Sequence, residues 1–599
     1  MQTALKIHVT GIVQGVGFRP FVYRLAKRYV ISGWVLNSAD GVHIHAEGED
    51  KLVDEFCLAI SSEAPAAARV EEIEMREVPL ESYTSFEIKT SEDKKTSKAG
   101  ASAGQTLISP DLATCEDCIR ELFDTKDRRY RYPFINCTNC GPRFTIIGQL
   151  PYDRCYTSMR TFKMCGICES EYLNPVDRRF HAQPDACFDC GPAVNWITAE
   201  SFKRSKCTDS QGAGVGTLGP LFIGDTREKS DKIFANCVQF LRDGKIVAIK
   251  GLGGFHLACD ATNSEAVARL RRRKMRSNKA FAIMAPDLAS VKKICKVNKA
   301  EEDLLTSPAH PIVLLQTFSQ LLSSPDQHFM TNSLGNFHLL PGLAPNVTMG
   351  LPETGVMLPY TPVQHILMHD YVQAGGQYLV MTSGNLYDNP IVTDDAEAYE
   401  VLGDVADAFL GNNREILARY DDSVVRVIDA AGSDAVQMIR RARGYAPAPI
   451  KIKLDKPAEV FATGPEQKNT FAFSRPIPEA DENSKFNTEI FVSQHIGDVE
   501  NADIFKTWED TRAQFEKIFK FKPCEVHHDL HPEYLTTKMG PGAMLPGGLS
   551  KTPVNNASDP KAIQHHYAHI RSVMYENGLS GPLLGFAFDG TGYGIDKNI

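Results

Sequence analysis

The sequence predicts a multidomain protein in which α/β and α+β domains accompany a cysteine-rich module. Its 599 residues exceed what one hydrophobic core organises, so we expect about three to five domains. Segments with strand-like alternation are followed by glycines and then by helical spacing, which indicates mixed α and β structure. Eight cysteines fall in four Cys-x-x-Cys pairs. A hydrophobic content of 43% and a charged content of 23% are ordinary for a globular protein.

Charge and hydropathy argue against several classes of protein. A net charge of −9 is mild for this length and disfavours a protein held to nucleic acid by bulk electrostatics, although a local basic patch stays open. The sequence contains no stretch of about 18 apolar residues, so we expect no membrane span. The N-terminus lacks the apolar core and cleavage site of a signal peptide, so we expect a cytoplasmic protein. In a reducing compartment, paired cysteines are typical of metal sites.

The first residues predict a strand, a glycine turn and a helix. Residues 5–13 alternate as a strand, and residues 20–29 have helical spacing. In such a turn the backbone N–H groups can converge on an anion such as phosphate, at the positive end of the helix. The Arg19 guanidinium can donate two charge-assisted hydrogen bonds to the same phosphate. Taken alone, a glycine turn before a helix is more often only a turn. The turn residues are Gln14, Gly15, Val16, Gly17 and Phe18.

Around this turn the sequence resembles the acylphosphatase family. The resemblance rests on Gly-Ile-Val-Gln-Gly-Val-Gly-Phe-Arg at residues 11–19, on residues 33–37 and on a closing strand at residues 83–88. It covers residues 1–92 and implies a ferredoxin-like domain that cleaves a mixed anhydride of phosphate with an acyl or carbamoyl group. By this resemblance Arg19 and the turn hold the phosphate, and Asn37 orients the attacking water.

The middle of the chain, residues 105–195, contains a duplication. In each copy two Cys-x-x-Cys pairs are separated by 18 residues, and Gly-Pro follows the second pair. Four thiolates satisfy a tetrahedral zinc ion with no open position, so we expect two structural zinc sites that stabilise a segment with little core. Whether each ion takes its ligands from one copy or from interleaved pairs stays open. The predicted ligands are Cys115, Cys118, Cys137 and Cys140 in the first copy and Cys165, Cys168, Cys187 and Cys190 in the second.

Both copies also carry a run of basic and aromatic residues. These runs are Arg-Arg-Tyr-Arg at residues 128–131 and Arg-Arg-Phe-His at residues 178–181. They could stack nucleic-acid bases. The alternative is a structural brace whose arginines dock on neighbouring domains, and the acidic net charge favours the brace.

After the duplication, helix and strand patterns resume. A buried strand at residues 245–249 runs into Lys250 and a glycine-rich segment, and a helix at residues 264–273 leads into Lys274 and Arg276. Five cations between residues 271 and 276 lie between this helix and the next strand, at residues 280–284. Such a run is usually a solvated helix end, but phosphates commonly bind between a helix and a strand.

This region, residues 220–447, resembles the YrdC/Sua5 family. Lys274-x-Arg276 is similar to its KxR motif, Ser383-Gly384-Asn385 to its SxN motif, and residues 422–425 and 439–444 to its closing strands. The resemblance implies attack of a carbamate on the α-phosphate of ATP, with Mg²⁺ accompanying the nucleotide. Ser383 and Asn385 bind the nucleotide or the carboxylate in this interpretation; alternatively they cap a turn. The implied nucleotide-binding residues are Lys250, Lys274, Arg276, Ser383, Asn385 and Arg441. Asn412 stands where the family leads us to expect histidine.

A final alternating pattern begins near Glu459. In the segment 564–569, His565 and His569 are four residues apart, so on a helix their imidazoles lie on one face and can share a metal. A bare HxxxH on a helix is more often not a metal site. Near the end, residues 582–588 predict a buried strand, and Asp589 with its following glycines suits a cation-assisted phosphate loop.

This last region, residues 456–599, resembles the Kae1-like carbamoyltransferase domain, of the sugar-kinase/Hsp70/actin fold. The resemblance implies iron or a similar divalent ion on His565 and His569, with Asp589 as a further ligand or facing nucleotide. The chain stops at Ile599, just after an apolar run and a glycine-rich turn. We therefore expect a C-terminally truncated chain.

The order of the four regions resembles the HypF family of hydrogenase maturation factors. It implies that carbamoyl phosphate is hydrolysed, that ATP converts the carbamate to carbamoyl-adenylate, and that the carbamoyl group passes to the C-terminal cysteine of HypE. That product is the precursor of the cyanide ligands of nickel–iron hydrogenase. The rivals are an enzyme of tRNA threonylcarbamoyladenosine synthesis, which has no use for an acylphosphatase site, and a non-catalytic zinc scaffold.

Overall fold

The structure is a computed structural model that divides into two compact units, Met1–Tyr387 with Ile391–Tyr445, and Asp388–Pro390 with Ala446–Ile599. The residues that the structure describes are 2–38, 41–65, 67–89, 107–150, 152–209, 221–318, 329–331, 337–339, 342–387, 389–430, 432–477, 484–538, 561–590 and 592–598.

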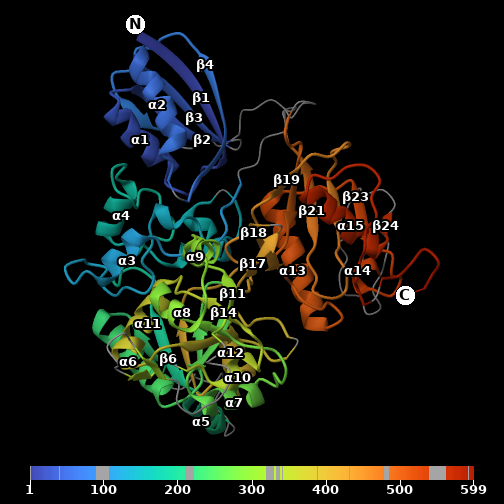
Figure 1. Ribbon diagram of the computed structural model, residues 1–599. Coiled ribbons are helices and arrows are strands. Elements are labelled where there is room, and N and C mark those ends of the chain that lie inside the picture. The colour runs from blue at the N-terminus through green and yellow to red at the C-terminus, as the bar shows by residue number, and fades with distance from the viewer. Residues whose placement is uncertain are drawn as a thin grey trace. The chain divides into compact units, whose positions relative to one another are not determined.

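The first domain (residues 2–89) is a five-stranded sheet with two helices on one face (Figure 1). The strand order is β4-β1-β3-β2-β5, and only β2 and β5 pair in parallel. Alternation in β1 places Ile7 and Val9 in the core. This is the expected ferredoxin-like arrangement. Its elements are β1 Gln2–Ile12, α1 Phe18–Arg28, β2 Ser32–Ser38, β3 Gly41–Glu49, α2 Asp50–Ser62, β4 Arg69–Glu77 and β5 Phe86–Ile88.

The cysteine module (residues 107–193) has little regular structure. Each copy of the duplication, named here the first repeat (residues 115–140) and the second repeat (residues 165–190), begins with one short α-helix directly after its first cysteine. Four short 3-10 turns are the other regular elements, and most of the remaining residues lie in turns and loops. The elements are α3 Glu116–Phe123, η1 Thr138–Cys140, η2 Phe144–Ile146, η3 Arg154–Tyr156, η4 Ser158–Thr161 and α4 Gly166–Leu173.

The large domain (residues 194–445) is built on an eleven-stranded mixed sheet of order β18-β17-β11-β14-β10-β15-β9-β8-β16-β6-β7. A separate two-stranded ribbon joins β12 and β13. The strands are β6 Val194–Thr198, β7 Phe222–Gly224, β8 Val247–Lys250, β9 Phe255–Asp260, β10 Ala282–Met284, β11 Ile312–Gln316, β12 Phe329–Thr331, β13 Phe337–Leu339, β14 Glu353–Met357, β15 Leu379–Ser383, β16 Ala408–Asn412, β17 Val424–Ala430 and β18 Ser433–Arg440.

Helices cover both faces of this sheet. On β9, Leu257 packs into one apolar cluster and its neighbour Ala258 into the other, as expected for a central strand buried on both sides. The helix α7 ends where the KxR motif begins, so the fold brings Lys274 to the end of a helix. The helices are α5 Ala199–Asp209, α6 Arg227–Arg242, α7 Ser264–Arg273, α8 Leu288–Ile294, α9 Lys299–Thr306, α10 Pro345–Thr348, α11 Pro362–Gln373 and α12 Asp395–Val401.

The second unit has a six-stranded sheet of order β19-β22-β21-β20-β23-β24. The long helix α13 buries Trp508 and Phe515 against aromatic rings that include Phe461 and Phe471. The elements are β19 Ile450–Ile452, β20 Val460–Ala462, β21 Ala472–Pro476, β22 Thr488–Val492, α13 Ala502–Phe519, β23 Glu525–Asp529, α14 Leu535–Lys538, β24 Lys561–Ile563 and α15 His565–Glu576.

The predicted buried strand at residues 582–588 is wrong. The segment forms no strand, and its side chains are exposed, with Leu584 82% and Phe588 99% exposed. A strand needs a neighbour that accepts and donates backbone hydrogen bonds, and no described residue pairs with this segment.

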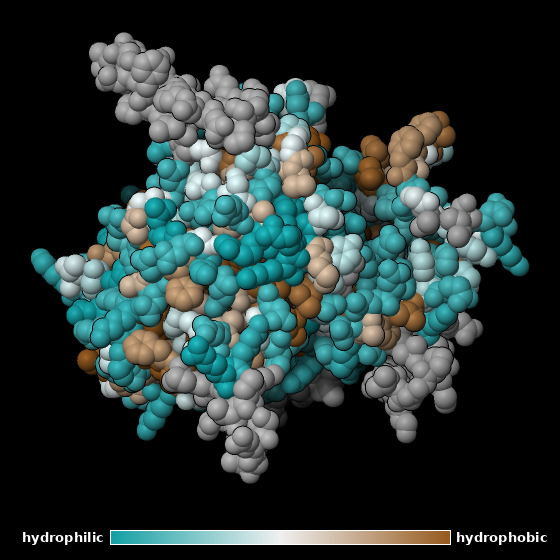
Figure 2. All heavy atoms as spheres, turned by 90° about the horizontal axis from the view of Figure 1, so that it is seen from below, coloured by the Kyte–Doolittle hydropathy of each residue, from teal (hydrophilic) through white to brown (hydrophobic). Residues whose placement is uncertain are grey.

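The molecular face in Figure 2 is largely hydrophilic, with apolar side chains in small groups. Among the described residues, no helix is both long and apolar enough to cross a membrane.

Candidate functional sites

The phosphate loop lies between β1 and α1. Gly15 and Gly17 adopt left-handed φ values of 73° and 76°, which a side chain would strain, and Gly17 is the N-cap of α1. The Gln14 side-chain amide donates hydrogen bonds to the carbonyl oxygens of Ser38 (2.6 Å) and Gly41 (2.9 Å). These bonds tie the loop to the end of β2, beside Asn37. Gln14 therefore contributes its backbone, rather than its amide, to any anion at the loop.

Arg19 and Asn37 both present polar groups without partners. Within the described ranges, Arg19 makes no ion pair or side-chain hydrogen bond, and the buried Oδ1 atom of Asn37 has no hydrogen-bond partner. Burial lowers the pKa of Arg19, and the nearby Tyr172 and Asp153 oppose that change. An unsatisfied buried polar atom such as Asn37 Oδ1 calls for an explanation, and both side chains have hydrogen-bonding capacity left for a ligand.

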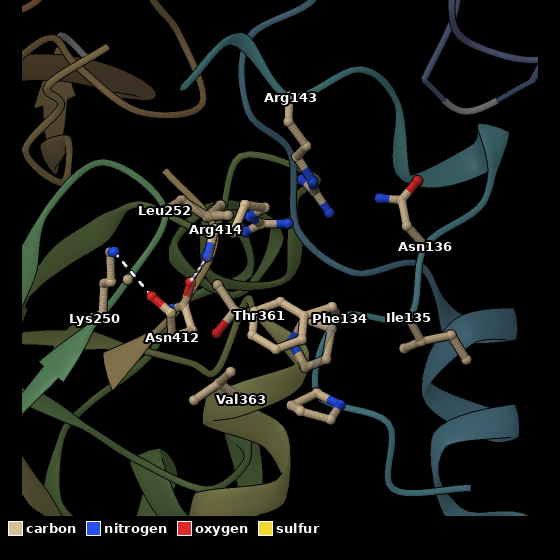
Figure 3. A pocket seen from close by; sticks show the side chains of 13 residues that line it. Phe134, Ile135, Asn136, Arg143, Lys250, Leu252, Thr361, Val363, Asn412 and Arg414 are labelled. Atoms are coloured by element: carbon tan, nitrogen blue, oxygen red, sulfur yellow. Dashed lines mark hydrogen bonds between the residues drawn. The ribbon is translucent and has the colours of Figure 1, made fainter. Parts of the chain in front are cut away.

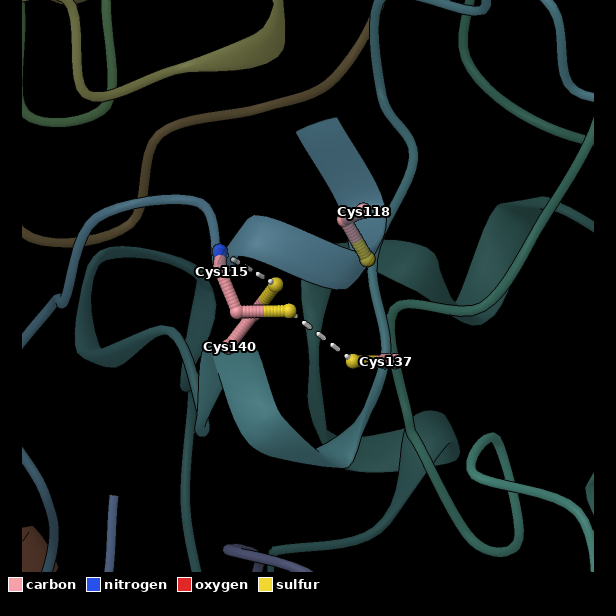
Figure 4. A group of neighbouring side chains, drawn as sticks. All are labelled: Cys115, Cys118, Cys137 and Cys140. Carbon is pink, nitrogen blue, oxygen red and sulfur yellow. Dashed lines mark hydrogen bonds between the residues drawn. The ribbon is translucent and has the colours of Figure 1, made fainter. Parts of the chain in front are cut away.

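The cysteines form two compact tetrads, each from one repeat, which answers the question of interleaving. In each tetrad the four Sγ atoms lie within 4.8 Å of one another. Sulfur–sulfur separations of 3.5 Å for Cys115 and Cys137 (Figure 4) and 3.8 Å for Cys165 and Cys187 match the separation of about 3.8 Å that tetrahedral Zn–S bonds require. The donor set and its geometry therefore fit zinc.

The arginines of each repeat bind the other repeat. Arg128 donates to the Cys168 sulfur at 2.9 Å, and Arg178 donates to the Cys118 sulfur at 3.3 Å. Both neighbouring arginines are buried in ion pairs: Arg129 with Glu171 and Asp185, and Arg179 with Glu121. These guanidinium groups are engaged within the protein, which favours the brace over base stacking.

Lys274, Ser383 and Asn385 meet in the large domain. The Lys274 ammonium donates to the carbonyl oxygens of Ser383 (2.6 Å) and Asn385 (2.7 Å) and to Asn385 Oδ1 (2.6 Å). Ser383 Oγ donates to the same Oδ1 at 2.8 Å. Burial, and then the charge of Arg276, lower the pKa of Lys274 to about 7. The KxR and SxN motifs, 109 residues apart in sequence, thus form one polar cluster.

Arg276 and Arg441 differ in their relation to this cluster. Arg276 donates to the backbone oxygens of Lys279 and Ala280, and burial lowers its pKa to about 10, with Arg271 as the next cause. Its charge also helps to lower the pKa of Lys274. Arg441 donates to the Tyr445 backbone oxygen at 3.1 Å, and no contact joins it to Lys274 among the described residues.

Lys250 lines a separate small cavity of about 30 Å³ (Figure 3). Its ammonium contacts the Asn412 backbone oxygen and the Asp395 carboxylate, both at 3.0 Å. Asn412 Oδ1 accepts a hydrogen bond from the Arg414 backbone N–H at 3.1 Å, so the unexpected asparagine stabilises the local turn. The wall also contains Arg143 and Asn136 from the cysteine module.

In the second unit, His565, His569 and Asp589 converge. His565 Nε2 lies 2.6 Å from Asp589 Oδ2 and 3.1 Å from His569 Nε2, and one ligand atom from each residue lies within 4.8 Å of the others. Two imidazoles and a carboxylate suit a divalent transition metal. The fit supports the predicted set.

Asp529, to which no sequence motif assigned a role, supports this site. Its Oδ2 lies 2.6 Å from His565 Nδ1, an arrangement that fixes the imidazole and leaves Nε2 for a metal. A carboxylate directly at the end of a strand was the available signal. Arg143 and Arg414 at the small cavity were also missed, because nothing in their local sequence marks them.

Four family models match separate parts of the chain. They are Acylphosphatase at residues 5–88, HypF finger at residues 114–147 and 164–197, the Sua5/YciO/YrdC model described as Telomere recombination at residues 239–442, and HypF Kae1-like domain at residues 455–576.

Longer matches cover nearly all of the chain. Carbamoyltransferase HypF2 of Cupriavidus necator is 41% identical over 99% of this chain and 66% of its own length, and carbamoyltransferase HypF of Synechocystis is 38% identical over 100% and 67%. A crystal structure of full-length HypF in the phosphate- and nucleotide-bound form is 42% identical, with a TM-score of 0.80 over 100% of this chain and 68% of that one. The chain spans about two thirds of the length of these relatives. On this evidence the chain belongs to the HypF family of carbamoyltransferases.

Proposed function

We propose that this chain makes and transfers an activated carbamoyl group. Carbamoyl phosphate is hydrolysed in the first domain, the carbamate is adenylated with ATP in the large domain, and the second unit carries the transfer site. By the family resemblance the acceptor is the C-terminal cysteine of HypE, in the maturation of nickel–iron hydrogenase. The observation that carries the proposal is the Arg19 guanidinium beside the phosphate loop, which makes no ion pair or side-chain hydrogen bond among the described residues.

In the first step, water cleaves carbamoyl phosphate to carbamate and inorganic phosphate. Arg19 and the N–H groups of the glycine loop bind the phosphate oxygens and stabilise the charge that develops on them. Asn37 Oδ1 accepts a hydrogen bond from the attacking water, which satisfies that buried oxygen.

In the second step, a carbamate oxygen attacks the α-phosphorus of Mg²⁺-bound ATP, and pyrophosphate leaves. Lys274 and Arg276 offset the charge on the phosphates, while Ser383 and Asn385 hydrogen-bond the nucleotide or the carbamate. For this to happen, the Lys274 ammonium exchanges at least one of its protein acceptors for a phosphate oxygen.

The cavity beside Lys250 suits the passage of a small anion. Its volume of about 30 Å³ exceeds that needed for one water, and Arg143, Arg414 and the unpartnered Asn136 Oδ1 supply polar contacts. Its wall combines residues of the cysteine module and the large domain. We propose that carbamate crosses here, shielded from bulk water.

In the second unit, His565, His569 and Asp589 would hold iron or a similar divalent ion, which would supply Lewis-acid polarisation of a carbonyl group. Asp529 keeps the His565 ring in the orientation that turns Nε2 toward the ion. Two thiolate tetrads are stable in a reducing environment, which supports a cytoplasmic location for the protein.

Exchange of labelled pyrophosphate into ATP tests the coupling of the first two steps. The wild-type protein is expected to exchange only with carbamoyl phosphate present, and both Arg19→Ala and Lys274→Ala are expected to lose exchange. Adding ammonium carbamate bypasses the first step, so it should restore exchange in Arg19→Ala but not in Lys274→Ala. The exposed neighbours Arg24→Ala and Arg272→Ala are the matched controls.

Other outcomes lead to other functions. Exchange that requires threonine and bicarbonate would indicate a tRNA-modifying enzyme. Absence of exchange under every condition, with two zinc ions bound, would indicate a scaffold.

A further inference from the structure

One buried histidine of the large domain has no part in the chemistry described so far. His256 is the second residue of β9, directly after the glycine-rich turn from β8, and is 5% exposed. Its Nε2 atom lies 2.9 Å from Asp422 Oδ2. Its Nδ1 atom is buried and has no hydrogen-bond partner among the described residues. A buried polar atom without a partner costs free energy, so we expect a ligand or a water to contact it.

Asp422 and Arg443 fix the orientation of this ring. Arg443 Nε donates to Asp422 Oδ1 at 2.7 Å, and the terminal nitrogens of Arg443 donate to two backbone oxygens. Burial raises the pKa of Asp422, but the charge of Arg443 and the hydrogen bond to His256 outweigh burial and hold that pKa well below its usual range. The ionised carboxylate can only accept, so Nε2 of the ring carries a proton. In a neutral ring with that proton, Nδ1 is an acceptor.

The strand pairing places His256 beside Ser383, whose hydroxyl belongs to the polar cluster around Lys274. His256 and Ser383 are direct partners in the antiparallel pair of β9 and β15. Side chains of such partners project from the same face of the sheet, with Cβ atoms about 4.5–5.5 Å apart. The packing agrees, because Ala258 and Met381, each two residues away on its strand, lie in the same apolar cluster. The imidazole therefore lies on the same side of the sheet as the Ser383 hydroxyl.

The His256 ring also adjoins the small cavity. A Cβ atom at Gly251 would lie 3.0 Å from both Nδ1 and Cε1 of His256, which is closer than ordinary van der Waals contact. Glycine at this position therefore lets the Nδ1 edge of the ring approach the backbone. Gly251 and its neighbour Lys250 line the cavity proposed for the passage of carbamate. His256 is thus a neighbour of both the cavity wall and the SxN motif.

We propose that His256 Nδ1 accepts a hydrogen bond from the amino group of carbamate and so selects carbamate over carboxylates without a donor in that place. The inference rests on the proposed adenylation of carbamate in the large domain. Lys274 and Arg276 are donors only, so they bind oxygens but not an amino group. Asn385 Oδ1 already accepts from Lys274 and Ser383. A carboxylate without an N–H group would leave Nδ1 buried and unpaired, which weakens its binding.

The first test is carbamate-dependent exchange of labelled pyrophosphate into ATP, measured with the full chain over a range of ammonium carbamate concentrations. The amide of glutamine reaches the position of Nε2, so His256→Gln keeps a donor to Asp422 and loses the acceptor at Nδ1. We expect the apparent KM for carbamate to rise about tenfold and the KM for ATP to stay within about twofold of wild type. The exposed His369→Gln, the same change in the same domain, is the matched control.

The second test needs no substitution in the protein. Acetate has the shape of carbamate, with a methyl group in place of the amino group. We expect acetate to inhibit exchange by the wild type only at concentrations about tenfold or more above the KM for carbamate. In His256→Gln the two constants should approach each other. Equal binding of acetate and carbamate by the wild type would show that the amino group is not recognised and would overturn the inference.

The outcomes separate this inference from the proposed function. If the wild type exchanges with carbamate, Lys274→Ala does not, and His256→Gln keeps the wild-type KM for carbamate, then His256 is not the acceptor and the function stands. A parallel rise of the KM values for carbamate and ATP in His256→Gln would assign His256 to the fold and would also overturn the inference. If the wild type shows no carbamate-dependent exchange, the proposed function fails and this inference fails with it.

Discussion

Arg19 and Lys274 are the two residues proposed to bind phosphate, but their contacts within the protein are opposite. Arg19 has no ion pair or side-chain hydrogen bond among the described residues. Lys274 already donates to three oxygens, the number of N–H bonds in an ammonium group. Under the proposed function, the Arg19 site can accept an anion without losing a contact, whereas Lys274 has to exchange protein contacts for those to a nucleotide.

The largest effect is expected at Arg19. The Arg19→Lys variant keeps the positive charge but loses the two parallel hydrogen bonds that a guanidinium donates to phosphate. The rate of carbamoyl phosphate hydrolysis should therefore fall about 10²- to 10³-fold. Release of inorganic phosphate measures the rate, and Arg24→Lys on the exposed side of α1 controls for general damage. Near-normal activity in Arg19→Lys would mean that charge alone suffices, and the contrast with Lys274 would disappear.

Lys274→Met should reduce carbamate-dependent pyrophosphate exchange about 10²-fold. The reason is that the Lys274 ammonium no longer donates to the phosphate oxygens on which negative charge develops in the transition state. Hydrolysis of carbamoyl phosphate should stay within about twofold of wild type, since Arg19 is untouched. A parallel fall in both activities would show that the two sites are not separate.

Proton uptake should distinguish the two cations directly. Because burial lowers the pKa of Lys274 to about 7, its amine is mostly neutral at pH 8 in the free protein and charged at pH 6. ATP phosphates favour the charged form, so binding should take up about one proton at pH 8 and almost none at pH 6. Calorimetry in buffers of different ionisation enthalpy measures this, and Lys274→Arg, which stays charged, should abolish the uptake.

The smallest effect is expected for Ser383→Ala. This change removes one hydrogen bond to Asn385 Oδ1, worth about 1 kcal/mol, so the KM for ATP in exchange should change by about five- to tenfold or less. A loss as large as that of Lys274→Met would indicate that Ser383 contacts the reacting phosphate.

Spacing along the chain allowed the zinc tetrads and the His565–His569 pair to be predicted, because their geometry is local. The cross-repeat bonds of Arg128 and Arg178, and the support of His565 by Asp529 36 residues away, depend on tertiary packing that no local pattern encodes. The Gln14 side-chain amide closes the β2–β3 hairpin, a contact over 24 and 27 residues that no local pattern encodes, and the predicted place of its backbone in the phosphate loop stays a prediction. The prediction of a strand at residues 582–588 failed because an apolar run forms a strand only where a neighbouring strand supplies backbone hydrogen bonds.

The exchange of arginines between the repeats has a consequence for metal loading. Four thiolates around one Zn²⁺ carry a net charge of about −2, and each cluster receives a guanidinium from the opposite repeat. When one ion binds, it orders the helix and loop that present this arginine to the other tetrad. Occupancy of either site therefore raises the affinity of the other by the same factor. During synthesis in the cell, chains with both ions or with none should outnumber half-loaded ones.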